Sequence, residues 1–376
     1  MVQVEAASGS AVNISCSRDE LAQRLGLVSR AVSTRTAVQI LSGVLLRAES
    51  GRVTLAATDM EVSLRAQLEA RAEGDGAVVV PGKLLVELTR LLPDDEVRIE
   101  SGAEESVVRI SCGSASYQLN SYNPEDFPRL PSVEGTQTFG VDGHALLETA
   151  ARVGRAASRD ESRPVLTGVL MRFEGDKLIM AATDSYRLSV QETVLGGSTP
   201  DLEAIVPARS LTELARIAQG ADTVEIGIHE NQVLFAANDI WLTTRRIDGQ
   251  FPNYKQLLPE TFEHELTLPR GELLEVVRRT AVLAQRNSPL RLRFAEGELT
   301  VSAQTHDVGE ARESLPVSFT GEPLEIGFNA EFLRDGIESL DDDELRLRLI
   351  SPLRPGLIQS AAGNFSYLIM PIRLAG

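Results

Sequence analysis

The sequence predicts an α+β protein built from three similar domains in tandem, and two observations support this. Gly43-Val44-Leu45 recurs as Gly168-Val169-Leu170, and Ala56-Ala57-Thr58-Asp59 recurs as Ala181-Ala182-Thr183-Asp184, both 125 positions later (168 − 43 and 181 − 56). A fixed period indicates one structural unit used repeatedly, and this period matches a domain of roughly 100–150 residues rather than a solenoid repeat of roughly 20–50. Predicted strands also dominate and are joined by short connections, which is typical of α+β folds.

A weaker third copy follows the first two. Residues 297–303 resemble residues 51–57, and the Phe328-Asn329 strand end with the helix after it resembles Val80-Pro81 and its helix. Linkers rich in Pro, Asp and Asn are expected at residues 123–131 and 248–259. We therefore expect domains at residues 11–128, 129–252 and 253–376, after a small, polar and disordered tail at residues 1–10.

The first domain begins with a predicted strand and helix. Residues 12–16 alternate between apolar and polar side chains, as a half-buried strand does. Ser17 and Glu20 have the spacing of a capping box at the start of the helix. The helix is expected to end near Ser33, and its apolar face consists of Leu21, Leu25, Val28 and Val32.

The rest of the first domain holds further strands and a second helix. Pro81 is expected to start this helix, because proline is favoured in a first helical turn. Its apolar face consists of Leu84, Leu85, Leu88 and Leu92. Strands are expected at residues 43–48, 52–57, 61–68, 77–80, 96–101, 106–112 and 115–120. Helices of the later domains are expected at residues 144–157, 208–218, 271–284 and 330–340, with both helices of each domain on one side of its sheets.

Composition is that of an ordinary globular protein. The chain has 376 residues, of which 43% are hydrophobic and 24% charged, enough for more than one core. No apolar run approaches the roughly 20 residues of a membrane span, and the N-terminus lacks the regions of a signal peptide, so we expect a cytoplasmic protein without a membrane partner. Cys16 and Cys112 are too few for a disulfide framework and are interpreted as buried small side chains.

Catalytic and metal-binding motifs are missing from the sequence. It has no glycine-rich phosphate loop, no Gly-x-Ser-x-Gly elbow and no Cys-x-x-Cys. The histidines lack ligand spacing, so we expect no metal and no cofactor: His144, His229, His264 and His306. Thr58-Asp59 and Thr183-Asp184 each lie between two strands, where Asp forms an Asx turn. A hydrolase using Thr183 and Asp184 is an alternative, but a duplicated pair is better explained by the fold, and we expect no enzymatic activity.

Arginines recur along the predicted helices. One interpretation is a set of solvated helix faces partly paired to nearby carboxylates. If all helices point the same way, however, the arginines share one surface, while acidic clusters at residues 94–96, 310–313 and 341–344 lie elsewhere in loops and strands. The net charge of −17 then does not exclude nucleic-acid binding, because binding depends on where the basic side chains cluster rather than on the sum of all charges. The candidate DNA-binding residues are Arg24, Arg30, Arg35, Arg152, Arg155, Arg209, Arg278 and Arg279.

The C-terminal stretch at residues 367–374 is apolar where chain ends are usually polar. One interpretation is an edge strand that Pro371 ends. The other is an exposed apolar wall of a groove that accepts a partner peptide.

Three motifs in the second half of the chain carry a family resemblance. They are Ala-Thr-Asp-x-x-Arg-Leu at residues 182–188, Asp-Gly-Gln-Phe-Pro-Asn-Tyr at residues 248–254 and Met-Pro-Ile-Arg-Leu at residues 370–374. With them the chain resembles the bacterial replicative sliding clamps, the beta subunits of DNA polymerase III, over nearly its whole length after the tail. The arginine-rich, lysine-poor composition also suggests a G+C-rich genome, such as that of an actinobacterium.

The resemblance implies the DNA clamp fold and a processivity factor of DNA replication. Such a protein forms a homodimeric ring of six domains that encircles duplex DNA, slides nonspecifically and tethers polymerases and repair proteins. The implied partners are the replicative polymerase alpha subunit, the clamp loader, translesion polymerases, ligase and mismatch-repair proteins. The competing interpretation is a stand-alone peptide-binding adaptor that does not encircle DNA.

The resemblance also implies positions for two sites. It places the dimer interface at Tyr117 and Leu119, on an edge strand of domain one, against Val282 and Leu283 on the helix of domain three. Departures from the family pattern are Ser185-Tyr186 in place of Gly-His, Gln256 in place of Arg, and the extension Ala375-Gly376. The implied peptide groove between domains two and three consists of Leu166, Thr183, Ser185, Arg187, Leu188, Pro252, Leu257, Leu353, Pro355, Leu368, Ile369, Met370, Pro371, Ile372, Arg373 and Leu374.

Overall fold

The computed structural model describes residues 11–33, 37–93, 95–102, 106–131, 137–229, 231–284, 288–305 and 309–374. The expected tail at residues 1–10, Arg35 and the Ala375-Gly376 extension lie outside these residues. The chain divides into two compact units: unit 1 is Met1–His144 with Thr212–Arg246, and unit 2 is Ala145–Leu211 with Ile247–Gly376. The second sequence repeat therefore contributes to both units.

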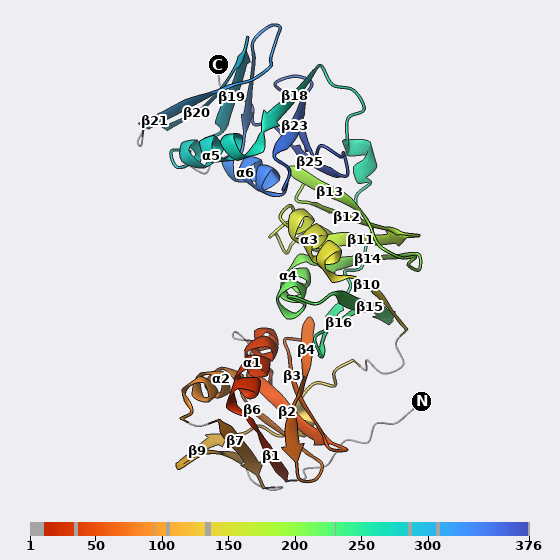
Figure 1. Ribbon diagram of the computed structural model, residues 1–376, viewed down its shortest axis with the longest axis vertical. Helices are drawn as coiled ribbons and strands as arrows, with labels where there is room; N and C mark the ends of the chain where they lie inside the picture. The colour runs from red at the N-terminus through yellow and green to blue at the C-terminus, as the bar shows by residue number, and fades with distance from the viewer. Residues whose placement is uncertain are drawn as a thin grey trace. The chain divides into compact units, whose positions relative to one another are not determined.

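The order of elements recurs along the chain (Figure 1). The first repeat contains β1 (Val12–Ser17), α1 (Arg18–Val28), η1 (Ser29–Ala31), η2 (Gln39–Ser42), β2 (Gly43–Glu49), β3 (Arg52–Thr58), β4 (Val62–Leu68), β5 (Ala70–Ala72), β6 (Gly76–Pro81), α2 (Gly82–Leu91), β7 (Glu96–Ser101), β8 (Val107–Cys112), β9 (Ala115–Asn120) and η3 (Pro124–Asp126). Here η denotes a short 3₁₀ helix.

The later repeats follow the same plan, with a strand and helix, further strands, a second helix and a last set of strands. The second contains β10 (Thr138–Asp142), α3 (Gly143–Gly154), η4 (Pro164–Thr167), β11 (Gly168–Glu174), β12 (Lys177–Thr183), β13 (Arg187–Val194), β14 (Leu202–Pro207), α4 (Ala208–Ile217), β15 (Thr223–His229), β16 (Gln232–Ala237) and β17 (Ile240–Arg245). The third contains η5 (Tyr254–Leu257), β18 (His264–Pro269), α5 (Arg270–Ala281), β19 (Leu290–Ala295), β20 (Glu298–Thr305), β21 (Gly309–Pro316), β22 (Leu324–Phe328), α6 (Ala330–Glu338), β23 (Glu344–Leu349), β24 (Gly356–Gln359) and β25 (Phe365–Ile369).

Unit 1 contains two antiparallel sheets. One has the strand order β5-β1-β7-β8-β9, and the other, with eight strands, has the order β10-β15-β16-β17-β4-β3-β2-β6. The larger sheet joins the first repeat to the second, because β4 pairs with β17, with Val62 opposite Thr244 and Ala66 opposite Ile240. Helix α1 packs on β3 and β4 and α2 on β2 and β6, so both cover the same side of this sheet (Figure 1).

Unit 2 has the same plan, but it joins the second repeat to the third. Its eight-stranded sheet has the order β14-β11-β12-β13-β25-β24-β23-β18, and its smaller sheet the order β21-β20-β19-β22. Here β13 of the second repeat pairs with β25 of the third, with Leu188 opposite Leu368. Helices α5 and α6 pack on each other, and α6 packs on β25 (Figure 1). The eight-stranded sheets therefore both combine strands of two successive repeats.

The structure confirms the predicted α+β class and corrects local details. The Ser17 side chain makes no capping hydrogen bond, because Ser17 is still paired with Glu96 in the sheet, and Glu20 instead accepts from Arg24 at 2.8 Å. The first helix ends at Val28 and continues only as the 3₁₀ turn η1. Pro81 is the last residue of β6 and precedes α2 rather than starting it.

Burial follows the predicted apolar faces in part. Leu21, Leu25 and Val28 are fully buried, whereas Leu84 is 47% exposed. Both cysteines are free and buried, as predicted, and burial raises the pKa of the Cys16 thiol to about 12. None of the described helices is long and apolar enough to cross a membrane.

Candidate peptide groove and arginine-rich helices

The duplicated Thr-Asp pairs form the same turn twice, as predicted. Asp184 Oδ1 accepts hydrogen bonds from the backbone N–H groups of Tyr186 and Arg187 at 2.9 and 3.0 Å. In the first copy Asp59 Oδ1 accepts from Glu61 and Val62 at 3.1 and 2.9 Å. The threonines also act alike, because each hydroxyl donates to the carbonyl four residues later. Both copies are Asx turns that join two strands.

Each turn contains one residue in the left-handed backbone region. Ser185 has φ 81° and Met60 has φ 77°. Residues with a Cβ adopt this region at a cost of roughly 1–2 kcal/mol, whereas glycine does not. The departure from glycine at Ser185 therefore leaves the turn conformation in place and adds local strain.

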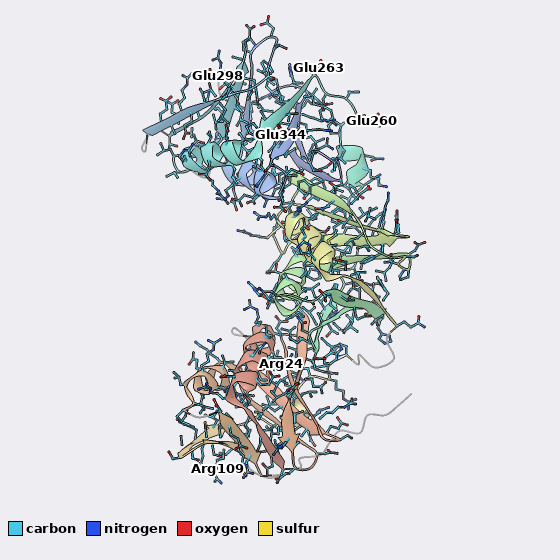
Figure 2. All side chains as sticks on the ribbon, in the orientation of Figure 1. Arg24, Arg109, Glu260, Glu263, Glu298 and Glu344 are labelled. Carbon is cyan, nitrogen blue, oxygen red and sulfur yellow. The ribbon has the colours of Figure 1, made fainter. Side chains whose placement is uncertain are left out.

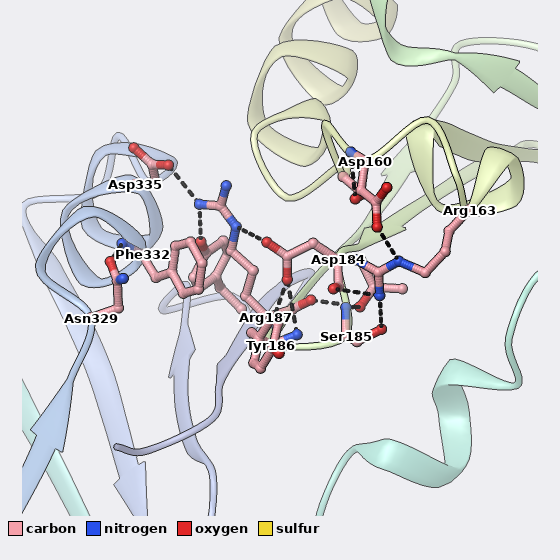
Figure 3. A network of polar contacts seen from close by, with 12 residues as sticks. Asp160, Arg163, Asp184, Ser185, Tyr186, Arg187, Asn329, Phe332 and Asp335 are labelled. Atoms are coloured by element: carbon pink, nitrogen blue, oxygen red, sulfur yellow. Dashed lines mark hydrogen bonds and ion pairs between the residues drawn. The ribbon is translucent and has the colours of Figure 1, made fainter. Parts of the chain in front are cut away.

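The second turn continues into a buried ionic network, which Figure 3 shows. The Arg187 side chain is 7% exposed, and its Nε donates to Asp184 Oδ2 at 3.1 Å. Its Nη1 donates to Asp335 Oδ2 at 2.6 Å and to the Tyr367 hydroxyl at 3.1 Å. The guanidinium also lies over the Phe332 ring, 4.3 Å from the ring centroid. One arginine therefore connects the turn to α6 and β25.

Electrostatics keep the Arg187 guanidinium of this network charged. Burial alone lowers the pKa of the Arg187 guanidinium, but the Tyr367 phenol and the carboxylates of Asp335 and Asp184 outweigh burial and raise the pKa above its ordinary value. Burial raises the pKa of the Tyr367 phenol, so this group stays neutral. Removing one partner of such a buried pair leaves an uncompensated charge, which costs about 3–5 kcal/mol.

A second arginine holds the turn from the opposite side (Figure 3). Arg163 Nη1 donates to Ser185 Oγ at 3.1 Å, and its Nε donates to Asp160 Oδ2 at 2.9 Å. Hydrogen bonds from Ser162, with support from Arg163, lower the pKa of the Asp160 carboxyl. The loop before η4 is thereby attached to the turn.

The predicted groove residues all lie in unit 2, but not all of them are accessible. Met370 N donates to the Tyr186 carbonyl at 2.8 Å, which continues the β13–β25 pairing beyond the strand ends. Ile372 then bridges to Gly327 of β22. Exposed side chains are Ser185, Leu257, Leu353, Met370 and Arg373; partly buried ones are Leu166, Pro252, Pro355, Pro371, Ile372 and Leu374; buried ones are Thr183, Arg187, Leu188, Leu368 and Ile369.

Two of the buried members belong to the core of unit 2. Leu188 and Leu368 belong to a core cluster with Phe251 and Tyr254 of the linker between the second and third repeats. Tyr186 is 62% exposed and its carbonyl accepts from Met370 N, yet it is not among the predicted groove residues, and neither are Asp335 and Phe332. The three-residue spacing of Phe332 and Asp335 places them on one helix face, but this spacing alone does not identify Arg187 as their partner.

The candidate DNA-binding arginines of the described residues are largely paired with acidic groups. In unit 1, Arg24 on α1 (Figure 2) also donates to the Asn238 carbonyl at 2.8 Å, and Arg30 pairs with Glu213 of α4. In unit 2, Arg155 pairs with Glu338 at 2.8 Å and Arg278 with the same carboxylate at 2.9 Å. Glu213 also accepts from Arg216 of its own helix, so Glu213 and Glu338 each pair with arginines of two successive repeats. Arg209 lies on α4 and is exposed.

The expected separation of the acidic clusters from the arginines is wrong at two positions. Asp341 accepts from Arg152 at 2.5 Å, and Glu313 pairs with Arg279 at 2.7 Å. Chain turns after α6 and along β21 bring these carboxylates back to the helices. DNA phosphates would therefore compete with carboxylates for these arginines.

One pocket of unit 1 gathers basic side chains. It has a volume of about 620 Å³ and lies at the exposed side of α1, where α1, α2 and the end of α4 meet. Arg24, Arg90 and Arg216 line it together with Gln23 and Asn238. The pocket adds Arg90 and Arg216 to the arginines that are candidates for phosphate contacts.

The predicted interface residues lie at sheet edges and helix ends. Tyr117 and Leu119 are on β9, the edge strand of the five-stranded sheet, as expected. Val282 and Leu283 are not within the helix, because α5 ends at Ala281. Val282 is 80% exposed, and Leu283 is partly buried where its carbonyl accepts from Thr305.

Comparisons with known proteins cover nearly the whole chain. Family models match as the N-terminal domain of the DNA polymerase III beta subunit at residues 12–131, its central domain at residues 140–253 and its C-terminal domain at residues 255–373. The beta sliding clamp of Streptomyces coelicolor is 35% identical over 97% of this chain and 100% of its own, and that of Synechococcus elongatus is 36% identical over 96% and 98%.

Solved structures are similar over the same length. The DNA polymerase sliding clamp from Bacillus subtilis has a TM-score of 0.92 at 27% identity, covering 97% of this chain and 100% of its own. A sliding clamp from Pseudomonas aeruginosa bound to griselimycin has a TM-score of 0.89 at 28% identity, with the same coverage.

Proposed function

This chain belongs to the family of DNA polymerase III beta subunits, the bacterial beta sliding clamps, and from that premise we propose that it is a processivity factor that encircles duplex DNA as a homodimeric ring. The main support for a ring is that strand pairing joins successive repeats at two junctions within the chain, while the equivalent third junction has no partner strand among the described residues. Strands β4 and β17 join the first two repeats, and β13 and β25 join the last two. The corresponding strands that lack such a partner among the described residues are β21 and β9, which lie at the edges of their sheets.

A second copy of the chain supplies the missing partner. Pairing β21 of one chain with β9 of another completes a third sheet on the plan of the two existing ones. It also removes two exposed edges, which soluble proteins otherwise have to protect. The contact is head-to-tail, and a head-to-tail contact that closes makes a ring. We therefore propose domains at residues 11–128, 129–252 and 253–376, and a dimer of such chains.

DNA contacts in this proposal are made by the helices and carry no base readout. Phosphate contacts position a protein without specifying sequence, which a sliding ring requires. The arginine-lined pocket of unit 1 and the arginines of α3 and α5 support phosphate contacts. The many paired carboxylates weaken those contacts, so retention on DNA comes from encirclement rather than from tight binding.

Partners attach through the groove of unit 2. Its exposed side chains are mostly apolar, and β13, β25 and the linker cluster hold them in place. We propose that it binds short segments with a glutamine and a pair of large apolar residues, carried by the polymerase alpha subunit, the clamp loader, translesion polymerases, ligase and mismatch-repair proteins. Tethering raises the effective concentration of such partners at DNA.

The experiment that tests the ring is a mass measurement by light scattering. We expect twice the chain mass of 40.8 kDa for the wild-type protein. Val282→Asp should yield monomers, because it places an unpaired charge in the interface. The substitution should not affect folding of the single chain, because the Val282 side chain is 80% exposed there. Val194→Asp, at another exposed apolar residue, is the matched control and should remain dimeric. A wild-type monomer at micromolar concentration, or a dimeric Val282→Asp protein, contradicts the proposed interface.

A further inference from the structure

The first two turns of α6 present one face to Arg187. Asn329 caps the helix by accepting from Phe332 N at 3.1 Å. Phe332 then stacks on the guanidinium, and Asp335, three residues later, accepts its hydrogen bond at 2.6 Å. Figure 3 shows these side chains on one side of Arg187 and the turn on the other.

Close packing holds α6 in this position. A Cβ atom at Gly336 would lie 2.6 Å from the Tyr367 ring, so only glycine permits this approach to β25. Tyr367 is fully buried and its hydroxyl accepts from Arg187. The helix therefore brings Asp335 against Arg187 on a rigid support.

We propose that Asp335 is a positioning residue of the peptide groove, acting through Arg187 and without touching the peptide. Asp335 fixes Arg187, Arg187 fixes the turn through Asp184, and the Tyr186 carbonyl holds Met370 at the groove wall. This inference rests on the proposed groove. It assigns Arg187, whose side chain is only 7% exposed, to the support of the groove rather than to its surface.

Fixing a turn in advance strengthens binding because the peptide then does not have to order it. Each immobilised side chain or loop residue otherwise lowers the affinity when a ligand binds. Tyr186 and Met370 are both well exposed, so their positions depend on the backbone that the network holds. Loosening the network should therefore weaken peptide binding without removing any peptide contact.

The test measures binding of a fluorescein-labelled peptide that carries a glutamine and two large apolar residues. We expect Asp335→Asn to weaken binding about tenfold, because the neutral amide no longer holds the guanidinium. Asp341→Asn is the matched control, because it removes another carboxylate of the third repeat, an exposed one that pairs with Arg152 of the second repeat and not with Arg187. It should leave the affinity unchanged.

A second variant separates positioning from stability. Arg187→Met with Asp184→Asn, Asp335→Leu and Tyr367→Phe removes every charge of the network, which often preserves stability. The amide oxygen introduced at position 184 can still accept the two backbone hydrogen bonds of the turn. We expect a thermal midpoint close to that of the wild type and a peptide affinity lowered about tenfold. Wild-type affinity in this variant, or in folded Asp335→Asn, overturns the inference. If Met370→Ala with Leu257→Ala also binds normally, the groove assignment itself fails, which is a distinguishable result.

Discussion

The turn at residues 58–62 and the turn at residues 183–187 have the same backbone and different surroundings. Both are Asx turns with the same threonine bonds and a left-handed third residue. Arg187 corresponds to Val62 and Arg163 to Val38, in each case 125 positions earlier (187 − 62 and 163 − 38). The shared part belongs to the fold. The two arginines are the additions that distinguish the turn next to the candidate groove.

The strands that follow these turns differ in the same way. The inward row of β4 consists of buried Val62, Leu64, Ala66 and Leu68. The corresponding row of β13 is Arg187, Ser189, Gln191 and Thr193, and Thr193 shares a hydrogen bond of 2.6 Å with Thr149. Arg187 and Thr193 are held by specific contacts, whereas Ser189 Oγ and Gln191 Oε1 are buried without a hydrogen-bond partner among the described residues. Burying unpaired polar groups costs stability, so this row of the second junction contributes less than the apolar row of the first.

Converting the second turn toward the first should have the largest effect. Arg187→Val leaves Asp335 and Asp184 with an unpaired buried charge and should destabilise unit 2 by about 3–5 kcal/mol. Hydrogen exchange of β13 and β25 amides measures this loss. Val62→Thr in the first turn is the control and should leave β13 and β25 unchanged. A loss below about 1 kcal/mol would mean that the network contributes little beyond packing.

Peptide binding should depend on side chains around the second turn and not on those of the first. Met370→Ala with Leu257→Ala removes two exposed apolar side chains and should weaken peptide binding by about 2 kcal/mol or more, over tenfold. These positions are preferable to Leu188, which is 2% exposed and part of the core. Met60→Ala, on the first turn, is the matched control in the fluorescence titration. Equal losses from both changes would contradict the assignment of binding to unit 2.

The two repeat junctions should resemble each other in their response to acid. Burial raises the pKa values of Glu213 and Glu338, but Arg30 and Arg216 at the first and Arg278 and Arg155 at the second outweigh burial and lower both pKa values from 4.5. A carboxyl whose pKa is lower in the folded state stabilises the protein at pH values above its ordinary pKa. This stabilisation is lost as the pH falls through the folded pKa.

Glutamine substitutions measure these contributions. Glu338→Gln should cost unit 2 no more than about 1 kcal/mol near neutral pH, because the arginines are half-exposed and solvent screens the pairs. The difference from the wild type should shrink as the pH falls from neutral through the lowered folded pKa, because protonation of the Glu338 carboxyl removes its pairing with the arginines. Denaturation curves across this range test the sign. A difference that grows on acidification would contradict it.

The smallest predicted effect concerns backbone strain in the turns. Met60→Gly removes the cost of a left-handed residue and should stabilise unit 1 by about 1 kcal/mol. Ser185→Gly should gain less, because it also removes the hydrogen bond from Arg163. Thermal midpoints of the two variants compare them. Equal gains would show that the Arg163 contact is not stabilising.

Periodicity predicted most of the fold because it reports local constraints. The repeats predicted the strand and helix order, and the Thr-Asp pairs predicted both turns. The pairing of β4 with β17 and of β13 with β25 was not predicted, because strands of successive repeats carry no local signal for their partners. For the same reason the partners of Arg187 and Arg155 were missed: they lie 148 and 183 residues away. The roles of the site residues stay predictions.

Topological retention on DNA tests the central claim most directly. The protein is assembled on a nicked circular plasmid with a clamp loader and ATP, and free protein is removed by gel filtration at raised salt. A single-cut restriction enzyme then linearises half of the sample. A ring should stay with the circle and leave the linear DNA, because phosphate contacts alone are weak at that salt concentration. Equal retention on both forms, or retention on neither, would contradict encirclement and favour an adaptor that binds partners without a ring.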